Sequence, residues 1–100
     1  MSRTHELKTE KEVFEATLAG VKLFEFRKND RGYDSGHMLA LNEWDAAKQH
    51  YTGRAVLVYV TYVLYRGYGI PEGYCIMSLD PKFKYHINGK DVKDHASCTD

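Results

Sequence analysis

The first amphipathic pattern in the chain has the period of a helix. Apolar or small side chains recur at intervals of three and four residues, as on one face of a helix: Val13, Phe14, Thr17 and Leu18. Thr9 and Glu12 have the capping-box spacing, in which two side chains satisfy unpaired backbone donors of the first turn. Gly20 can adopt the left-handed conformation that ends a helix. The pattern therefore predicts a helix of about ten residues that begins at about Glu10.

The period then changes to the two-residue alternation of a strand over residues 22–28. We expect Phe24 and Phe26 to face the core, on the side of the strand opposite Leu23, Glu25 and Arg27. Residues 29–36 are rich in Asn, Asp, Ser and Gly and predict turns. Strand character resumes over residues 37–44, so we expect a hairpin-like return from the preceding strand.

The most apolar segment of the chain is residues 54–65, which predicts the central strand. Its tyrosines are expected to lie in the core or in a barrel wall: Tyr59, Tyr62 and Tyr65. Residues 66–73 carry three glycines and a proline and predict a loop, and residues 74–79 predict another buried strand. The pair Asn88-Gly89 favours a tight hairpin turn near the carboxyl-terminal end.

One early helix followed by five or six strands favours a small α+β domain built around a curled sheet or barrel. The 100 residues are enough for one domain with its own core. Hydrophobic residues make up 43% of the chain and charged residues 28%, as in ordinary globular proteins rather than disordered ones.

Charge and cysteine content narrow the classes of function. The 14 basic and 14 acidic residues cancel, which excludes the overall positive field of a protein that coats DNA, so an anionic partner must be bound by a local patch. Two cysteines, Cys75 and Cys98, are too few for a disulfide scaffold and are expected to be free thiols. Residues 1–11 lack the apolar stretch of a signal peptide, and no apolar run is long enough to cross a bilayer. We therefore expect a cytoplasmic protein with no membrane partner.

Ionisable side chains are concentrated between residues 22 and 31. Glu25 and Arg27 are two residues apart and project to the same side of the predicted strand, while Lys22 approaches from the junction between helix and strand. An ordinary solvated strand face with a weak surface ion pair explains this spacing. A polar pocket for a ligand explains it as well, and the spacing alone leaves both interpretations open.

Several segments together resemble an ASCH-type domain of the PUA-like superfamily, and more narrowly a small bacterial and phage family of unknown function. They are "HELKT" at 5–9, "LAGVKLFEFRKNDRGYDSGHMLALNEW" at 18–44, "YTGRAVLVYVTYVL" at 51–64 and "GIPEGYCIMSL" at 69–79. The resemblance implies a barrel of about six strands with an amino-terminal helix beside a cleft, in a superfamily associated with RNA and modified nucleosides. It assigns residues 1–80 to this domain. Residues 81–100 are then a hairpin or tail that either belongs to the same domain or is partly disordered.

Site residues follow from this resemblance residue by residue. The superfamily signature falls on four positions at the floor of the expected cleft: Gly20, Lys22, Glu25 and Arg27. The narrower family's opening falls on His5, Leu7 and Lys8, and its "Arg-Lys-Asn-Asp-Arg" on residues 27–31. Where relatives usually have Gly-Asp, this chain has Gly36-His37, which changes the chemistry of that loop.

The leading prediction is an RNA- or nucleotide-binding module. Five cations are expected to attract phosphate: Lys8, Lys22, Arg27, Lys28 and Arg31. Glu25 and Asn29 would then hydrogen-bond a base edge or a ribose, with His5 beside the cleft. Tyr33, Tyr68 and Tyr74 border loops and are candidates for stacking on a base.

A hydrolase acting on a modified nucleoside is the runner-up. ASCH relatives that hydrolyse acetylated cytidine use a Thr nucleophile in the signature, and that position is Glu25 here. A carboxylate is a poor nucleophile towards an amide, but Glu25 paired with Lys22 can act as a general base for water.

A protein-interaction module is the third alternative, based on the apolar loop from Tyr68 to Tyr74 around Ile70 and Pro71. The five histidines show no metal-ligand spacing, so no metal site is predicted. No phosphate-binding loop or other cofactor motif is present, and no cofactor is predicted.

Overall fold

The computed structural model describes residues 3–92 of the chain and shows one five-stranded sheet with one short helix. Its elements are β1 (Thr4–Glu10), α1 (Lys11–Leu18), β2 (Phe24–Lys28), β3 (Met38–Asp45), β4 (His50–Leu64) and β5 (Tyr74–Ile87). The predicted α+β class with a curled sheet is confirmed, with five strands in the described residues rather than about six. No helix in this part of the chain is long and apolar enough to span a membrane.

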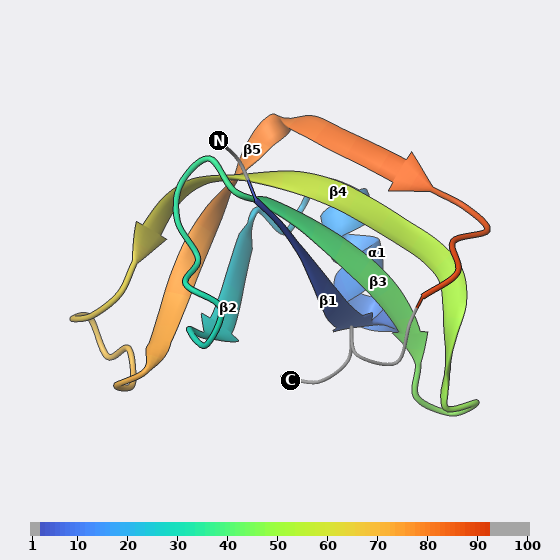
Figure 1. The fold of residues 1–100 in the computed structure, drawn as a ribbon, viewed down its shortest axis with the longest axis horizontal. Coiled ribbons are helices and arrows are strands. Elements are labelled where there is room, and N and C mark those ends of the chain that lie inside the picture. Colours follow the sequence, from blue (N-terminus) through green and yellow to red (C-terminus); the bar gives the residue numbers. More distant parts are fainter. Residues whose placement is uncertain (1–2, 93–100) are drawn as a thin grey trace.

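The sheet has the order β1-β3-β4-β5-β2, so that β1 and β2 form its two edges. β1 runs parallel to β3, and the other neighbouring strands are antiparallel. In Figure 1, β4 and β5 arch over the top of the view and β1 and β2 lie below them. Among the described residues no backbone ladder joins β1 to β2, so the sheet is a half-barrel open on one side.

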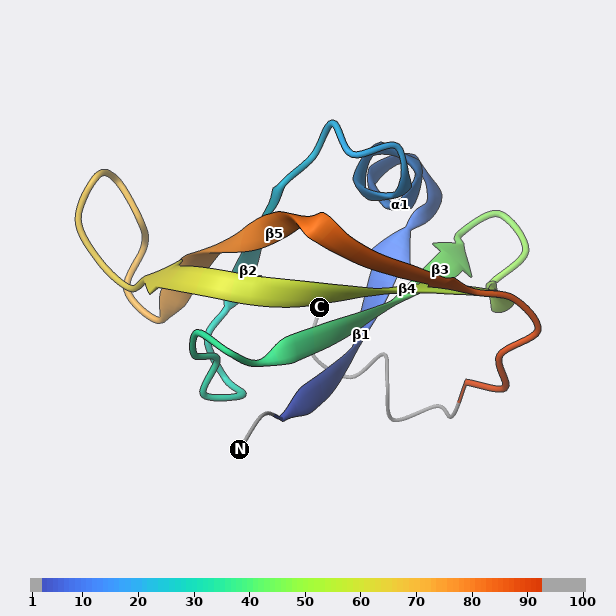
Figure 2. The ribbon, with the colours of Figure 1, turned by 90° about the horizontal axis from the view of Figure 1, so that it is seen from above.

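The core fills the inner side of this arch. Its fully buried side chains come from alternate positions of the strands, as the two-residue period requires: Leu7, Leu39, Leu41, Val56, Val58, Val60, Cys75 and Met77. α1 covers one side of the sheet, as the view from above shows in Figure 2. It contributes Phe14 and Thr17 as its buried residues.

The predicted helix is confirmed to within a residue, but its predicted cap is wrong. Glu10 occupies the N-cap position and its side chain makes no capping hydrogen bond. The Thr9 hydroxyl instead accepts a hydrogen bond from the guanidinium of Arg27, at 3.2 Å. A distant strand therefore engages the side chain that the local pattern assigned to the helix end.

The orientation predicted for β2 is also wrong. Phe24 and Phe26 are 49% and 47% exposed, whereas Glu25 and Arg27 are 3% and 8% exposed. The alternation itself is correct, so the two faces are exchanged. The charged face turns inward because its side chains find ion-pair and hydrogen-bond partners there, which burial of a charge requires.

Two strand pairings differ from the prediction. β2 pairs with β5 rather than returning to β3 as a hairpin. Residues 4–10, for which the pattern gave no strand, form β1 beside β3. Both pairings join segments that are far apart in sequence, which local periodicity cannot specify.

The predicted strands over residues 54–65 and 74–79 are confirmed as parts of β4 and β5. Three tyrosines expected in the core are exposed instead: Tyr59 and Tyr62 of β4, and Tyr65 directly after it. β5 continues to Ile87, and residues 88–92 form no strand, so the hairpin predicted at Asn88-Gly89 is absent from the described residues. Cys75 is a buried free thiol, while Cys98 lies outside the described residues.

Phe14 is the one large apolar side chain that α1 buries completely, and its ring lies 5.0 Å from the Arg54 guanidinium. Replacing Phe14 with Ala should lower the free energy of unfolding by about 3–5 kcal/mol, because the cavity left under the helix cannot collapse fully. Val13→Ala, at an exposed position of the same helix, should change it by less than about 1 kcal/mol. Urea denaturation followed by circular dichroism measures both. Equal effects would contradict this account of helix docking.

Candidate nucleotide-binding pocket

A pocket of about 350 Å³ lies where the open side of the sheet meets the start of α1. Its lining comes from β1, α1 and β2 and the residues just before β2: Lys8, Thr9, Glu10, Val13, Lys22, Phe24, Glu25, Phe26 and Arg27. Four of the predicted site residues therefore line one pocket: Lys8, Lys22, Glu25 and Arg27. The volume is at the small end of the range of about 300–1,000 Å³ typical of ligand sites.

The buried Glu25 carboxylate is held between two cations. Its Oε2 accepts a hydrogen bond from Lys22 Nζ at 2.8 Å, and its Oε1 accepts one from Arg27 Nε at 2.8 Å. Charge-assisted hydrogen bonds of this kind are among the strongest in proteins. The weak surface ion pair, one of the two interpretations of this spacing, is thus excluded.

Arg27 also connects the two edges of the sheet. Its Nη2 donates to the Lys8 carbonyl oxygen at 3.1 Å and to Thr9 Oγ1 at 3.2 Å. Farther along β1, Arg31 Nη1 donates to the Glu6 carbonyl oxygen at 2.9 Å. Arginine side chains therefore join β2 and its following loop to β1, where a closed barrel would have a backbone ladder.

Lys22 lies across the outer edge of β2. Its Nζ donates to the Phe24 carbonyl oxygen at 2.7 Å as well as to Glu25, and it lies 4.8 Å from the centre of the Phe24 ring. An ammonium group has three donors, so one remains after these two hydrogen bonds. Lys8 is partly buried, with its Nζ 4.8 Å from the centre of the Trp44 ring.

His5 and Tyr33 lie outside this pocket. Both are buried, with their ring centres 4.8 Å apart, and Tyr65 donates a hydrogen bond to the Tyr33 carbonyl oxygen. Burial raises the pKa of Tyr33 to about 12. Tyr33 is therefore a core residue, whereas the stacking role predicted for it needs an exposed ring.

His5 pairs with His37, the residue at which this chain departs from the expected Gly-Asp. His5 Nε2 lies 3.0 Å from His37 Nδ1, and His37 Nδ1 also accepts from the Asp34 backbone N–H. Burial, with the nearby Arg3, His37 and Arg31, lowers the pKa of His5 to about 4. These contacts attach the loop before β3 to β1.

The remaining predicted ligand residues do not line the pocket. Asn29 Oδ1 accepts from the Tyr33 backbone N–H at 3.2 Å and shapes the turn after β2. Lys28 is exposed at the end of β2. Tyr74 stacks against Phe26, one of the lining residues, with ring centres 5.5 Å apart, but does not itself line the pocket.

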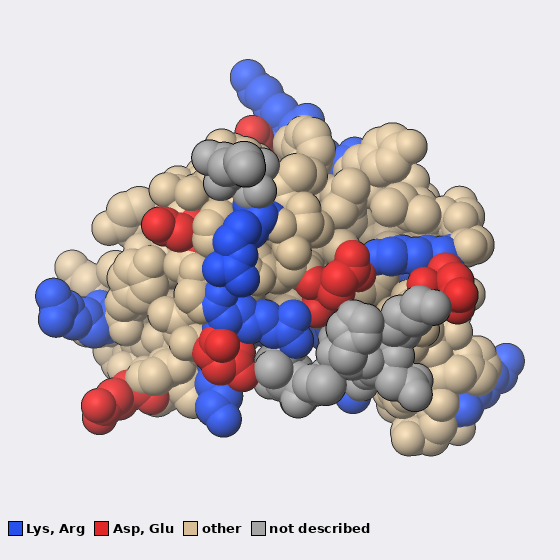
Figure 3. All heavy atoms as spheres, viewed as in Figure 1, with Lys and Arg blue, Asp and Glu red and all other residues tan. Residues whose placement is uncertain are grey.

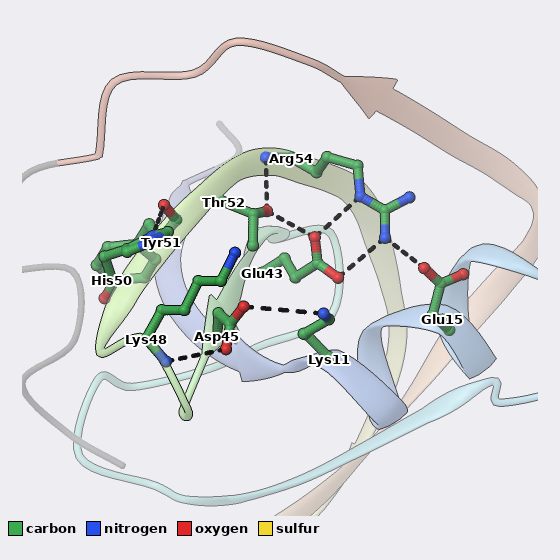
Figure 4. Close-up of polar contacts among 9 residues, drawn as sticks. All are labelled: Lys11, Glu15, Glu43, Asp45, Lys48, His50, Tyr51, Thr52 and Arg54. Carbon is green, nitrogen blue, oxygen red and sulfur yellow. Dashed lines mark hydrogen bonds and ion pairs between the residues drawn. The ribbon is translucent and has the colours of Figure 1, made fainter.

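A second ionic network, which the sequence did not predict, lies between α1 and the sheet (Figure 4). The buried Glu43 carboxylate accepts hydrogen bonds from Thr52 and, through both oxygens, from Arg54, which also pairs with Glu15 of α1. The hydrogen bonds from Arg54 lower the pKa of Glu43. No short-range pattern links these residues, because they come from three elements. These side chains satisfy one another's charges and hydrogen-bonding groups. Together they attach α1 to the sheet.

A larger, open hollow of about 680 Å³ lies between the turn joining β3 to β4 and residues 89–92. None of the predicted site residues lines it, and it adjoins the end of the described chain. Within the described residues no three His, Cys, Asp or Glu side chains gather as metal ligands. The pocket between β1 and β2 is therefore the candidate site.

Comparison with known proteins shows which family the chain belongs to. A family model described as "Domain of unknown function (DUF3850)" matches residues 4–79. The chain belongs to the DUF3850 family. Every residue that lines the candidate pocket lies within the matched segment of this DUF3850 member.

The DUF3850 chain is also similar to a phage protein, the "Uncharacterized 12.9 kDa protein in GpA 3'region" of Escherichia phage P2. The two are 41% identical over 61 residues, which is 61% of this chain and 54% of the phage protein. The match thus spans about half the length of that relative. Neither comparison refers to an ASCH domain, so the ASCH resemblance stays a prediction.

The lowered pKa of His5 makes stability depend on pH. The folded state holds His5 neutral down to about pH 4, whereas the unfolded chain protonates it below about pH 6.5. The unfolded state therefore binds more protons within this window, and acidification from pH 7.5 to pH 5 should remove about 2 kcal/mol through this residue. Urea unfolding at both pH values should show a smaller loss for His5→Gln than for the wild type. His50→Gln, at an exposed site, is the control and should keep the wild-type pH dependence.

Arg27→Lys tests the closure of the sheet. A lysine keeps the charge but lacks the planar fork that donates to Glu25, Lys8 and Thr9 together, so we expect a loss of about 2–4 kcal/mol in unfolding free energy. Amide hydrogen exchange should quicken more in β1 than in β4, because β1 loses its link to β2. Lys28→Gln, at the exposed neighbour, should stay within about 0.5 kcal/mol of the wild type. Wild-type stability of Arg27→Lys would refute this role.

Proposed function

We propose that this DUF3850 domain binds RNA or a nucleotide in the pocket between β1 and β2. The observation that carries the proposal is a polar floor of Lys22, Glu25 and Arg27 beside the half-exposed rings of Phe24 and Phe26. A nucleotide combines the groups that such a pocket complements, namely a flat apolar base with polar edges and an anionic phosphate.

The charge of the lining supports a small anionic ligand. Three cations face two carboxylates, which leaves a net charge of about +1 around the pocket: Lys8, Lys22 and Arg27 against Glu10 and Glu25. A chain of zero net charge can attract an anion only at such a local site. Binding is then restricted to the pocket and its surroundings rather than spread over the surface.

In this proposal, residues other than the predicted tyrosines make the aromatic contact with the base. Phe24 and Phe26 line the pocket, and the Lys22 ammonium lies against the face of Phe24. A base stacked on either ring would gain about 1–3 kcal/mol. The same two rings were expected in the core, so the inversion of β2 is what makes them available to a ligand.

An ASCH or PUA-like fold is part of this proposal. The half-barrel with a helix beside a pocket supports it, as do the positions of the signature residues Lys22, Glu25 and Arg27 at the pocket floor. Gly20 has φ of +82°, a conformation that favours glycine, at the turn that leads into the pocket. A cytoplasmic location, where RNA and nucleotides are abundant, belongs to the same proposal.

Binding is better supported than hydrolysis. The Lys22–Glu25 pair that a hydrolase would use lies in the pocket, but each Glu25 oxygen already accepts a hydrogen bond from a cation. A catalytic water would have to compete with Lys22 and Arg27 for these two oxygens. Hydrolysis of a modified nucleoside stays a prediction, as does a protein partner at the loop of Tyr68, whose side chain is 92% exposed.

Phe24→Ala tests the pocket directly. Calorimetric titration with AMP, CMP, GMP, UMP and a single-stranded hexaribonucleotide of random sequence should show binding to the wild type. The variant should bind about 5–150-fold more weakly, which corresponds to the loss of one stacking contact. Tyr85→Ala removes an exposed ring of β5 that does not line the pocket and should bind as the wild type does. The proposal fails if none of these probes binds the wild type, or if Phe24→Ala binds equally well.

A further inference from the structure

The outer face of β2, β5 and the end of β4 carries a cluster of apolar side chains. Residues that lie opposite one another in antiparallel strands project from the same face of a sheet. Cross-strand pairing forms two rows on this face: Phe24, Ser78 and Tyr62, then Phe26, Ile76 and Leu64. Tyr74 lies one row further along β5 and stacks on Phe26. We call the apolar members of these rows the aromatic face: Phe24, Phe26, Tyr62, Leu64, Tyr74 and Ile76.

The aromatic face is turned away from the core. The alternate residues of the same strands are buried on the inner side, among them Glu25 and Met77. On the outer side Phe24 and Phe26 are half-exposed, and Tyr62 and Tyr74 are 63% and 37% exposed. Figure 1 shows β2, β5 and the end of β4 on the left of the view, while α1 packs on β1 and β3. Apolar rings exposed together on a sheet face mark an interaction surface.

The exposed area of these rings is of the size that a protein–protein contact needs. A Phe or Tyr side chain offers about 150–250 Å² for burial, so four half-exposed rings present about 400 Å². Two copies of the aromatic face would bury about 800 Å² through the rings alone, half of a standard interface of about 1,600 Å². Residues 66–73, the loop that joins β4 to β5 beside this face, are mostly exposed and supply further area.

We propose that the aromatic face binds a second copy of this chain and forms a two-fold symmetric dimer with the two sheets face to face. Sheets pack in this way at a separation of about 10 Å, with the side chains of the two faces interdigitating. A two-fold interface uses the same patch of both copies, and a residue on the axis faces its own counterpart. Ile76 lies in the middle of β5, the central strand of this face, so we place the axis there.

The charges on and around the aromatic face favour a second copy as its partner. Neither row contains a charged side chain, so a charged partner would find no ion pair there. Lys28 lies off centre, opposite Tyr74, and a two-fold axis through Ile76 keeps the two Lys28 side chains apart.

The charge of the whole molecule is also compatible with self-association. Figure 3 shows acidic and basic side chains next to one another on the front face of the molecule. The 14 basic and 14 acidic residues of the chain cancel, so two copies carry no overall repulsion. A net charge near zero favours association of like molecules.

The dimer goes beyond the proposed function and does not depend on it. Phe24 and Phe26 border the pocket as well as the aromatic face, so a ligand and a second copy would compete for these two rings. A bound ligand should then favour the monomer. Association of two copies needs no ligand, and the experiment below uses none. Failure of nucleotide binding would therefore leave the dimer unaffected.

Sedimentation velocity measures the association directly. An interface of this size should give a dimer that dissociates at micromolar concentrations, so loading from about 1 to 500 μM covers the transition. The weight-average mass of the wild type should rise over this range from that of one chain towards that of two.

Tyr62→Lys tests the aromatic face. It should weaken dimerisation at least about tenfold, because a charge would replace an aromatic ring in the contact. Tyr85→Lys is the matched control, since Tyr85 is 61% exposed, nearly as much as Tyr62, but lies on β5 outside the two rows. It should dimerise as the wild type does. Both variants should keep the wild-type urea midpoint, which shows that the fold is intact.

Ile76→Asp and Ile76→Lys test the position of the axis. Each variant alone should be monomeric, because like charges would meet at the axis. An equimolar mixture of the two should restore the dimer, because opposite charges then face each other. This rescue distinguishes a second copy from any other partner, and circular dichroism checks that both variants are folded.

Each outcome has a definite meaning. A wild type that stays monomeric over the whole range overturns the proposal, in favour of a different protein as the occupant of this face. Wild-type dimerisation of Tyr62→Lys, or loss of the dimer in Tyr85→Lys, overturns the assignment of the interface to the aromatic face. Dimers of either Ile76 variant alone, or the absence of rescue in their mixture, overturn the two-fold axis at Ile76.

Discussion

The structure depends on a buried carboxylate shared by two cations. Glu25 accepts hydrogen bonds from Lys22 and Arg27, and Arg27 in turn donates to the backbone and side chain of β1. Breaking such a buried ionic group by removing one member typically costs about 3–5 kcal/mol, because it leaves the other charges unpaired. This one cluster thus connects the two edge strands, which no backbone ladder joins within residues 3–92.

Closure by side chains has two consequences for the open side of the sheet. The edge strands of a sheet expose unpaired backbone groups that invite pairing with other chains, and cationic side chains are a common protection against it. Here Lys22, Arg27 and Arg31 donate to carbonyls of Phe24, Lys8 and Glu6 on the two edges. The same side chains keep β1 and β2 apart, and the space between them is the pocket.

A second ionic network holds the helix that forms the pocket's remaining wall. Arg54 lies against the ring of Phe14 and pairs with both Glu43 of β3 and Glu15 of α1. The helix is only eight residues long, too short to be stable alone, so its position depends on these tertiary contacts. The strands and the helix that line the pocket are therefore held in place by charged groups from distant parts of the chain.

The sequence by itself determined the local features of this protein. Periodicity predicts four elements, because each pattern depends on neighbouring residues alone. They are the helix near residues 11–18, the strands at 38–45 and 74–79, and the central strand. Resemblance placed Lys8, Lys22, Glu25 and Arg27 together, and these four residues do line one pocket. Only the tertiary structure decided which face of β2 is buried, since two partners distant in sequence, Lys8 and Thr9, are needed to satisfy Arg27 there. It also placed Tyr33 in the core and Phe24 at the pocket, because burial depends on which elements meet, and the local alternation does not specify that.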